Sequence, residues 1–264
     1  MSDLASLAHL NRAHAATEGN TWGGYRSVIE AAITSQPRSQ QKRIGPSEVG
    51  NPCTRCLTHK LIGTPESERH APWLPWIGTA VHAQLEDVFM QANADLEQTR
   101  YLVEATVAVG EIGGQVITGH ADLFDLEVGE VTDWKIVGAT TLRNAKANGP
   151  SETYRTQAHL YGLGFAFRGL TVHRVRIAYL PRNSVHLGDA HIWSEPFDPV
   201  RAMTAIQRAD EIAQTIAKAG PETALDAAGP HLGSEHSCTK FPDAPQASVS
   251  GPGHNTTQHL LNIA

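Results

Sequence analysis

Two aspartates and one lysine in the middle of the chain could act together on one substrate. Asp133 and Lys135 are two residues apart in the run EVTDWKIV, so on a β-strand they project from one face, with Trp134 on the other. Asp122 lies upstream, and a hairpin that turns near Gly129 brings it alongside. Two close carboxylates repel each other unless a cation lies between them, and hard divalent cations take oxygen ligands. A metal ion, a lysine and a positioned water are the parts that phosphodiester hydrolysis requires.

The same pattern has a plainer interpretation. The D-x-K spacing occurs often by chance, and alternating charges usually mark a solvated face. However, Val131, Ile136 and Val137 surround the polar pair with β-branched residues, which indicates a strand inside a core. A charged pair on such a strand needs a partner or a function, so the flanks favour the catalytic interpretation.

Composition and charge exclude several classes of protein. The 264 residues are 41% hydrophobic and 18% charged, which excludes bulk disorder. The net charge of −6 excludes a polycation that coats nucleic acid, although residues 26–60 hold six Lys or Arg against two Glu. No apolar run reaches the roughly 18–20 residues of a membrane span, and the start does not resemble a secretory signal. With only three cysteines, we expect a cytoplasmic protein without membrane contact.

Hydrophobic periodicity predicts a small sheet surrounded by helices. Segments 101–109, 115–126 and 130–137 are expected to form an antiparallel meander, and 172–180 a further strand that pairs with 189–197. Helices are expected at 21–34, 47–63 (opened by Ser47, and either kinked at Pro52 or beginning only near residue 52), 76–92, 140–147, 151–169 and 198–220. The fold class is therefore α/β or α+β, a central mixed β-sheet flanked by helices. We divide the chain into a helical and basic extension (1–46), a core domain (47–228) and a mostly irregular tail (229–264).

These motifs resemble the PD-(D/E)XK nuclease superfamily, in particular its RecB-like exonuclease branch, over residues 47–180. GHAD and TDWK carry the aspartates and the lysine. GTAVH, from Gly78 to His82, resembles the G-x-x-x-H of that branch, and QAHLY, from Gln157 to Tyr161, resembles its Q-x-x-x-Y. SEVG, which begins at Ser47, is a frequent companion. The resemblance implies a restriction-endonuclease-like core.

The resemblance also implies a metal site. Asp122 and Asp133 would bind Mg²⁺, which Mn²⁺ can replace. His82 would be an additional ligand, and the backbone carbonyl of Trp134 would complete the inner shell. We interpret Glu104 as a strand-edge charge, with a place at the site as the alternative.

Further residues are implied in catalysis and in DNA binding. Lys135 would be the catalytic lysine, while Gln157 and Tyr161 would position either the DNA backbone or the lysine; Tyr161 could equally be a core aromatic. The DNA contacts proposed from position and charge are Ser47, Arg55 and Lys60, with Arg174, Arg176 and the Trp73–Trp76 pair as further candidates. Ordinary surface exposure or packing explains these residues equally well.

The cysteines depart from the pattern of the branch, in which many members hold an iron–sulfur cluster with four cysteines. This chain has Cys53 and Cys56 before the motifs and only Cys238 after them. The three could form a zinc or iron–sulfur site with His236 or His59. We expect instead that Cys53 and Cys56 are helix residues without a metal.

The predicted function is that of a metal-dependent deoxyribonuclease, above all an exonuclease that hydrolyses phosphodiester bonds at DNA ends in recombination or repair. Its expected partners are DNA and a recombination protein. The branch includes CRISPR-associated exonucleases, and a small freestanding member suits a bacteriophage. The alternatives are a structure-specific endonuclease of the junction resolvase type and a DNA-binding module without catalysis.

Overall fold

The computed structural model describes residues 21–35, 44–67, 72–233, 238 and 240–243. Within the predicted N-terminal extension it shows a helix, α2 (Thr21–Thr34), as expected. Residues 1–20, His236 and most of the predicted tail lie outside the described residues. The proposed division of the chain into three parts stays a prediction.

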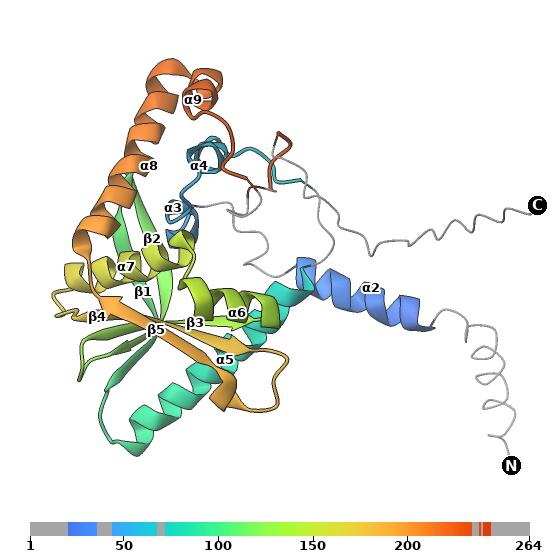
Figure 1. Ribbon diagram of the computed structural model, residues 1–264, viewed down its shortest axis with the longest axis vertical. Coiled ribbons are helices and arrows are strands. Elements are labelled where there is room, and N and C mark those ends of the chain that lie inside the picture. The colour runs from blue at the N-terminus through green and yellow to red at the C-terminus, as the bar shows by residue number, and fades with distance from the viewer. Residues whose placement is uncertain (1–20, 36–43, 68–71, 234–237, 239, 244–264) are drawn as a thin grey trace, which may run out of the picture.

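Five strands of the described chain form one mixed sheet in the order β1-β2-β3-β4-β5 (Figure 1). The strands are β1 (Tyr101–Ile112), β2 (Gln115–Asp125), β3 (Glu130–Val137), β4 (Arg174–Pro181) and β5 (His191–Pro196). Every neighbouring pair is antiparallel except β3 and β4, which are parallel. The predicted meander and the pairing of 189–197 with 172–180 are therefore confirmed.

Glycines make the two tight turns of the meander. Gly113 and Gly114, between β1 and β2, have φ of 57° and 76°, and Gly129, before β3, has φ of 64°. Residues other than glycine rarely adopt this left-handed backbone conformation. A Cβ at Gly129 would also lie 2.7 Å from the carbonyl oxygen of Thr171. The hairpin that aligns β2 with β3 thus depends on this glycine.

Helices flank the sheet, which confirms the predicted class. They are α3 (Pro46–Val49), α4 (Thr54–Ile62), α5 (Trp73–Asp95), α6 (Ala139–Asn148), α7 (Glu152–Phe167), α8 (Pro199–Ala219) and α9 (Pro221–Ala227), with a short 3₁₀ turn, η2 (Leu187–Asp189). The segment with α6 and α7 connects the parallel strands β3 and β4, as a parallel pair requires. None of the helices in the described ranges is long and apolar enough to cross a membrane.

The predicted caps of the two long C-terminal helices are confirmed. Ser151 accepts a hydrogen bond from the Tyr154 N–H at the start of α7. Asp198 accepts hydrogen bonds from the N–H groups of Val200 and Arg201 at the start of α8. These side chains satisfy backbone donors that have no partner inside a helix.

The prediction of one kinked helix over 47–63 is wrong, whereas the alternative of a helix that begins near residue 52 agrees with α4. Two short helices, α3 and α4, occupy this segment, capped by Gly45 and Cys53 rather than by Ser47. Between them, Pro52 has no N–H to donate, and Asn51 accepts the Cys53 N–H in a local turn over 2.9 Å. The helix expected from residue 76 begins at Trp73, because Pro75 lies in its first turn, where proline is tolerated.

The core lies where α7 packs on the sheet. All residues of α7 from Thr156 to Phe165 are buried, and the helix contacts β1, β3 and β4. A Cβ at Gly164 would lie 2.7 Å from side-chain carbons of Val107 on β1, so the glycine permits this close approach. Gln157 and Tyr161 are thereby held against the strands that carry the aspartates.

Candidate active site

The two aspartates and the lysine meet on neighbouring strands. Asp133 and Lys135 share a face of β3, and Lys135 Nζ lies 2.6 Å from Asp133 Oδ2. The β2–β3 register pairs Leu123 with Thr132, so its continuation places Asp122 opposite Asp133. Asp122 Oδ2 accepts a hydrogen bond from the Trp134 N–H over 2.7 Å. Both aspartates are buried. The predicted convergence of these groups is thus present.

Trp134 lies between Asp133 and Lys135 in sequence and lines a pocket together with Lys135 and His82. Its ring stacks on Phe89 of α5 with centroids 5.7 Å apart. The expected position of Trp134 on the face opposite Lys135 stays a prediction. The role of its carbonyl oxygen as a metal ligand stays a prediction.

Helix α5 brings His82 to Asp122. His82 Nδ1 lies 3.2 Å from Asp122 Oδ1 and 3.8 Å from Glu104 Oε1. His82, Glu104 and Asp122 each offer one ligand atom, and these atoms lie within 4.8 Å of one another. His82 therefore lies at the site, as expected, although it comes from helix α5, which precedes the strands in the sequence.

Glu104 belongs to this group, contrary to its interpretation as a strand-edge charge. Its φ of 44° lies in the left-handed region, which is uncommon for a residue with a side chain. The β1–β2 ladder pairs Val103 with Leu123 and Ala105 with Ala121 and leaves Glu104 between them. This local departure from strand geometry directs the carboxylate toward His82 and Asp122. Strained conformations of this kind concentrate at functional sites.

The donor set fits a divalent cation. Asp133 Oδ2 and His82 Nδ1 are buried and make no hydrogen bond of regular geometry, although each has an oppositely charged group nearby. Carboxylate oxygens with one imidazole suit Mg²⁺ or Mn²⁺. Asp122, Asp133, Glu104 and His82 could therefore hold such an ion.

The acidic side chains of the site are compensated by Lys135 and His82 without a metal. Burial raises the pKa of Asp133 to about 6, against the opposing attraction of Lys135. Burial lowers the pKa of His82, but its contacts with Asp122 and Glu104 outweigh this and raise it to about 9. A metal ion at this position would replace the His82 proton as the positive partner of the carboxylates.

Lys135 is held as a cation. Burial opposes its charge, but the attraction of Asp133 and Asp122 is stronger and raises its pKa. Its Nζ donates a hydrogen bond to Gln157 Oε1 over 3.1 Å and lies 4.6 Å from the centroid of the Tyr154 ring. A lysine in this state can contact a phosphate oxygen, whereas it is a poor base at neutral pH.

Helix α7 supplies the residues that hold Lys135. Gln157 Nε2 donates to the hydroxyl oxygen of Tyr161 over 3.1 Å, so the two predicted residues of Q-x-x-x-Y form one chain of contacts that ends on the lysine. Tyr154, one turn earlier, was not predicted. Its only signal in the sequence is its position three residues before Gln157 on the same helix.

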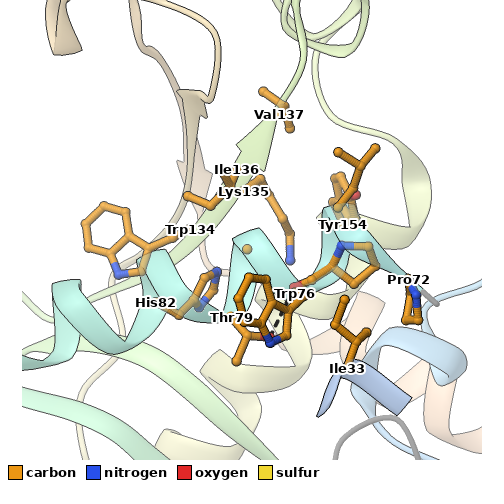
Figure 2. Close-up of a pocket in the computed structure, with 13 residues that line it drawn as sticks. Ile33, Pro72, Trp76, Thr79, His82, Trp134, Lys135, Ile136, Val137 and Tyr154 are labelled. Atoms are coloured by element: carbon orange, nitrogen blue, oxygen red, sulfur yellow. Dashed lines mark hydrogen bonds between the residues drawn. The ribbon is translucent and has the colours of Figure 1, made fainter. Parts of the chain in front are cut away.

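A pocket of about 510 Å³ opens beside these side chains (Figure 2). Its lining includes His82, Lys135 and Tyr154, together with Gly78 and Trp76 from the first turns of α5. In Figure 2, the Lys135 side chain extends from β3 toward helix α5, which carries His82 and Trp76. The Trp76 ring stacks on Trp73 with centroids 5.2 Å apart, which supports the packing role considered for this pair.

The structure places the predicted polar and charged DNA contacts outside this pocket. Arg55 is paired with Asp243 over 2.6 Å and donates to the carbonyl oxygens of Leu225 and Gly229. Lys60 is paired with Glu66, and Ser47 donates to Glu48. The roles of Arg55, Lys60 and Ser47 as DNA contacts stay predictions, with the contacts of the Arg55 guanidinium within the protein as a plainer explanation of that residue. Arg174 and Arg176 are paired with Glu130, also outside the pocket lining.

The prediction that Cys53 and Cys56 both lie within a helix is wrong for Cys53. Cys53 precedes α4 as its N-cap instead of lying within the helix. Cys53 lies next to Cys56, His231 and Cys238, and the four ligand atoms of these residues are within 4.8 Å of one another. His59 stacks on His231 at a centroid distance of 6.0 Å, but is not one of the four.

Comparisons with known proteins show a remote likeness. No family model matches the chain, and neither does any curated protein. Among solved structures it is similar to SSO0001, with 18% identity and a TM-score of 0.42 over 68% of this chain and 78% of that chain. It is also similar to an alkaline exonuclease (LHK-Exo) from Laribacter hongkongensis, with 13% identity and a TM-score of 0.44 over 72% of this chain and 95% of that chain. The same exonuclease in complex with dAMP gives 14% identity and a TM-score of 0.43 over the same shares.

Proposed function

We propose that the protein is a metal-dependent deoxyribonuclease that removes nucleotides from DNA ends. One observation carries the proposal: Asp122, Asp133 and Lys135 meet with His82 and Glu104 beside a pocket that Lys135 and His82 line. A cation site next to a buried ammonium group suits a substrate with two or more negative oxygens around one centre. A phosphodiester is such a substrate.

Each side chain has a role in this proposal. Asp122, Asp133, Glu104 and His82 would hold Mg²⁺ or Mn²⁺, and a bound ion would lower the pKa of water and neutralise charge on the phosphate. Lys135, a cation that donates a hydrogen bond to Gln157, would contact a phosphate oxygen or orient the attacking water. The rings of Trp76 and Tyr154 in the pocket lining offer surfaces on which a base can stack.

The proposed preference for ends rests on two features. The pocket volume of about 510 Å³ suits a small ligand, and therefore the terminal nucleotides of a strand better than the side of a duplex. Gln157 and Tyr161, the two residues of the Q-x-x-x-Y motif, are in contact. By resemblance, this motif indicates an exonuclease. The place in recombination or repair is a proposal that follows from this activity.

The activity is tested with purified full-length protein on linear and on covalently closed circular DNA. Each substrate is incubated with Mg²⁺, with Mn²⁺ and with a chelator. Degradation of linear DNA alone, only with metal, is the expected result. Cleavage of closed circles would show a structure-specific endonuclease instead. Retarded but intact DNA would show a DNA-binding module, and either result would overturn the proposed exonuclease.

Two variants test the site within that assay. Asp133→Ala and Lys135→Ala should each abolish cleavage while the circular dichroism spectrum stays that of the wild type. Lys146→Ala is the matched control. Within the described part of the chain, the Lys146 amino group donates a hydrogen bond to the carbonyl oxygen of Asp189, away from the site. Wild-type rates in either site variant would contradict the assignment.

A further inference from the structure

A second cluster of metal-ligating side chains lies outside the pocket, where α4 meets the chain that follows α9 (Figure 1). It consists of Cys53, Cys56, His231 and Cys238. The three cysteines are buried, and no two of them form a disulfide bond. His231 Nδ1 lies 3.7 Å from Cys53 Sγ and 3.3 Å from Cys56 Sγ. Three thiols and an imidazole nitrogen therefore point to one centre.

The start of α4 presents the first two thiols together. Cys53 has extended backbone dihedrals as the N-cap, and its Sγ accepts the N–H of Cys56 over 3.5 Å. Asn51 accepts the Cys53 N–H over 2.9 Å and thus fixes the turn before the helix. The C-x-x-C spacing at such a turn is the spacing with which structural zinc sites hold two ligands.

The spacing of the four ligand atoms suits a single ion. All four lie within 4.8 Å of one another. In a tetrahedral site with Zn–S bonds of about 2.3 Å, two sulfur ligands lie about 3.8 Å apart, and sulfur and nitrogen about 3.6 Å apart. An iron–sulfur cluster would insert its own irons and sulfides between the thiolates, which requires a wider arrangement. Thiolate and imidazole ligands in a closed four-coordinate set favour zinc.

A carboxylate orients the histidine from behind. His231 Nε2 lies 3.1 Å from Asp243 Oδ1, on the side of the ring away from the thiols. Asp243 is in turn paired with Arg55 Nε over 2.6 Å. A proton on Nε2 that is donated to Asp243 leaves Nδ1 with a lone pair toward the cysteines. Zinc-binding histidines commonly have a carboxylate in this position.

We propose that Cys53, Cys56, His231 and Cys238 bind one Zn²⁺, which joins the segment after α9 to helix α4. The metal would be structural, because all four ligands come from the protein and leave no open position. The site is independent of the proposed nuclease function, since its ligands are absent from the lining of the nuclease pocket.

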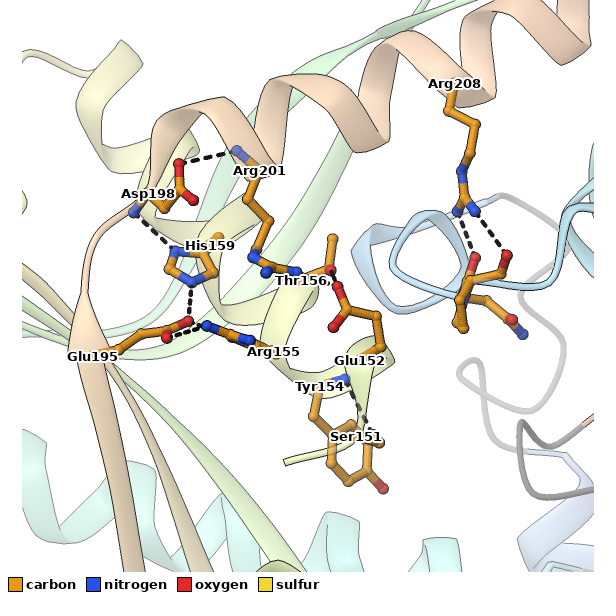
Figure 3. A network of polar contacts seen from close by, with 12 residues as sticks. Ser151, Glu152, Tyr154, Arg155, Thr156, His159, Glu195, Asp198, Arg201 and Arg208 are labelled. Atoms are coloured by element: carbon orange, nitrogen blue, oxygen red, sulfur yellow. Dashed lines mark hydrogen bonds and ion pairs between the residues drawn. The ribbon is translucent and has the colours of Figure 1, made fainter. Parts of the chain in front are cut away.

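The consequence for the fold follows from the neighbours of α4. Gly50, just before α4, packs so closely on α7 that a Cβ would lie 2.7 Å from the Thr153 carbonyl oxygen. Arg208 of α8, labelled in Figure 3, donates to the carbonyl oxygens of Val49 and Pro52 in the same segment. Zinc would therefore fasten the chain that follows α9 to a segment that is already held by α7 and α8. Removal of zinc should lower the stability of this whole region.

Metal content is measured first, in wild-type protein and in Asp133→Ala, so that zinc in the nuclease pocket is not counted as this site. The expected result is about one zinc per chain in both, without acid-labile sulfide. Replacement with Co²⁺ should give the visible absorption of a tetrahedral thiolate complex. Protein without zinc that also fails to bind Co²⁺, or protein with stoichiometric iron and sulfide, would overturn the proposal.

Variants then identify the ligands. Cys238→Ser and His231→Ala should lose the zinc, whereas His186→Ala, at an exposed histidine, should keep it. His231→Cys should keep one metal, and its Co²⁺ form should show stronger sulfur-to-metal charge transfer because a fourth thiolate is present. Zinc retained in both Cys238→Ser and His231→Ala would contradict the site.

A chelator titration of the wild-type protein covers the case in which a ligand variant does not fold. Removal of zinc should lower the melting temperature, and added Zn²⁺ should restore it. Asp243→Asn should fold and bind zinc about 10- to 100-fold more weakly, because it loses the charge that orients His231. A melting temperature unaffected by loss of zinc would show that the ion does not fasten the fold.

Discussion

Lys135 of β3 donates a hydrogen bond to Gln157 Oε1 of α7 over 3.1 Å, so the position of the ammonium group depends on a helix that follows the strand in sequence. Gln157 is itself fixed by its contact with the Tyr161 hydroxyl. The side chains that position the lysine are therefore on a buried helix and not on a surface loop. This arrangement separates residues that act on the substrate from residues that position them.

Gln157→Ala should lower kcat for DNA cleavage by about 10- to 100-fold, since hydrogen bonds to charged groups contribute about 1.5–3 kcal/mol. Tyr161→Phe should have a smaller effect, because it removes only the partner of Gln157. KM should change little in both variants, as neither side chain lines the pocket. Steady-state rates on linear DNA and melting curves check this prediction. A folded Gln157→Ala protein with unchanged kcat would show that Lys135 does not need this contact.

Gly78→Ala should stabilise the protein and weaken DNA cleavage. Gly78 lies inside α5, and a Cβ there would have nothing within 4 Å. Glycine in a helix interior costs about 0.5–1 kcal/mol relative to alanine, so the melting temperature should rise by about 2 °C. Because Gly78 lines the pocket, the added methyl group should raise KM for DNA.

Gly24→Ala is the control for this prediction. Gly24 lies in α2, also has nothing within 4 Å of an added Cβ, and is not part of the pocket lining. It should raise stability without a change in cleavage. If both variants cleave DNA at the wild-type rate, Gly78 does not leave room for the substrate.

Much of this arrangement could be predicted from the sequence where the signals are local. The alternation along 130–137 places Asp133 and Lys135 on one face, and Gly129 marks the turn that aligns β2 with β3. The caps Ser151 and Asp198 mark the starts of α7 and α8. In each case the physical cause lies within a few residues of its effect.

The features that the sequence did not predict depend on local backbone conformation or on contacts between distant segments. Glu104 faces the site only because its backbone takes a left-handed conformation inside β1, which no residue type there requires. His231 meets Cys53 across 178 positions, and the histidine is one of 14 in the chain. The break between α3 and α4 was left open by the sequence because Pro52 permits either a kink or an end of the helix.

Gly119→Ala should destabilise the protein through the contact of β2 with α3 and α7. A Cβ at Gly119 would lie 2.6 Å from Pro46 Cγ and 2.9 Å from Tyr161 Cε1. Such overpacking typically costs about 1–3 kcal/mol. Cleavage should also fall, because displacement of Tyr161 disturbs Gln157. Denaturant unfolding and cleavage rates measure the two effects.

A double variant separates this contact from a general effect on the strand. Gly119→Ala with Pro46→Ala should recover part of the lost stability, since the ring carbons that an added Cβ meets are gone. Thr118→Ala, at the exposed neighbouring position, should change stability little. Additive losses in the double variant would contradict the proposed steric cause.

His159 and Glu195 should make the fold sensitive to acid. The His159 side chain is fully buried, and its Nδ1 accepts the Asp198 N–H over 3.1 Å (Figure 3). The proton is therefore on Nε2, which donates to Glu195 Oε1 over 2.7 Å. Arg155 binds the same carboxylate with two contacts of 2.6 and 2.5 Å. A second proton on His159 would disrupt the hydrogen bond from Asp198.

The direction of the pH effect follows from the two pKa shifts. Burial lowers the pKa of His159 below its ordinary value of 6.5, although Glu195 opposes this. Its contribution to stability is therefore complete above that value and is lost as the pH falls below it, because the unfolded chain binds the proton more readily. Burial raises the pKa of Glu195, but Arg155 and His159 outweigh this and lower it, so its contribution is lost only in stronger acid, below its ordinary value of 4.5.

His159→Asn should therefore lower the free energy of unfolding by about 1–3 kcal/mol at pH 7.5, through the loss of buried hydrogen bonds. Its difference from the wild type should shrink as the pH falls from 7.5 to 5, because the wild type alone loses the contribution of neutral His159. Urea unfolding at several pH values measures this difference, with His186→Asn as the exposed control. A difference that stays constant over this range would show that His159 does not change its protonation state on unfolding, and the tautomer inferred from Asp198 would then need another explanation.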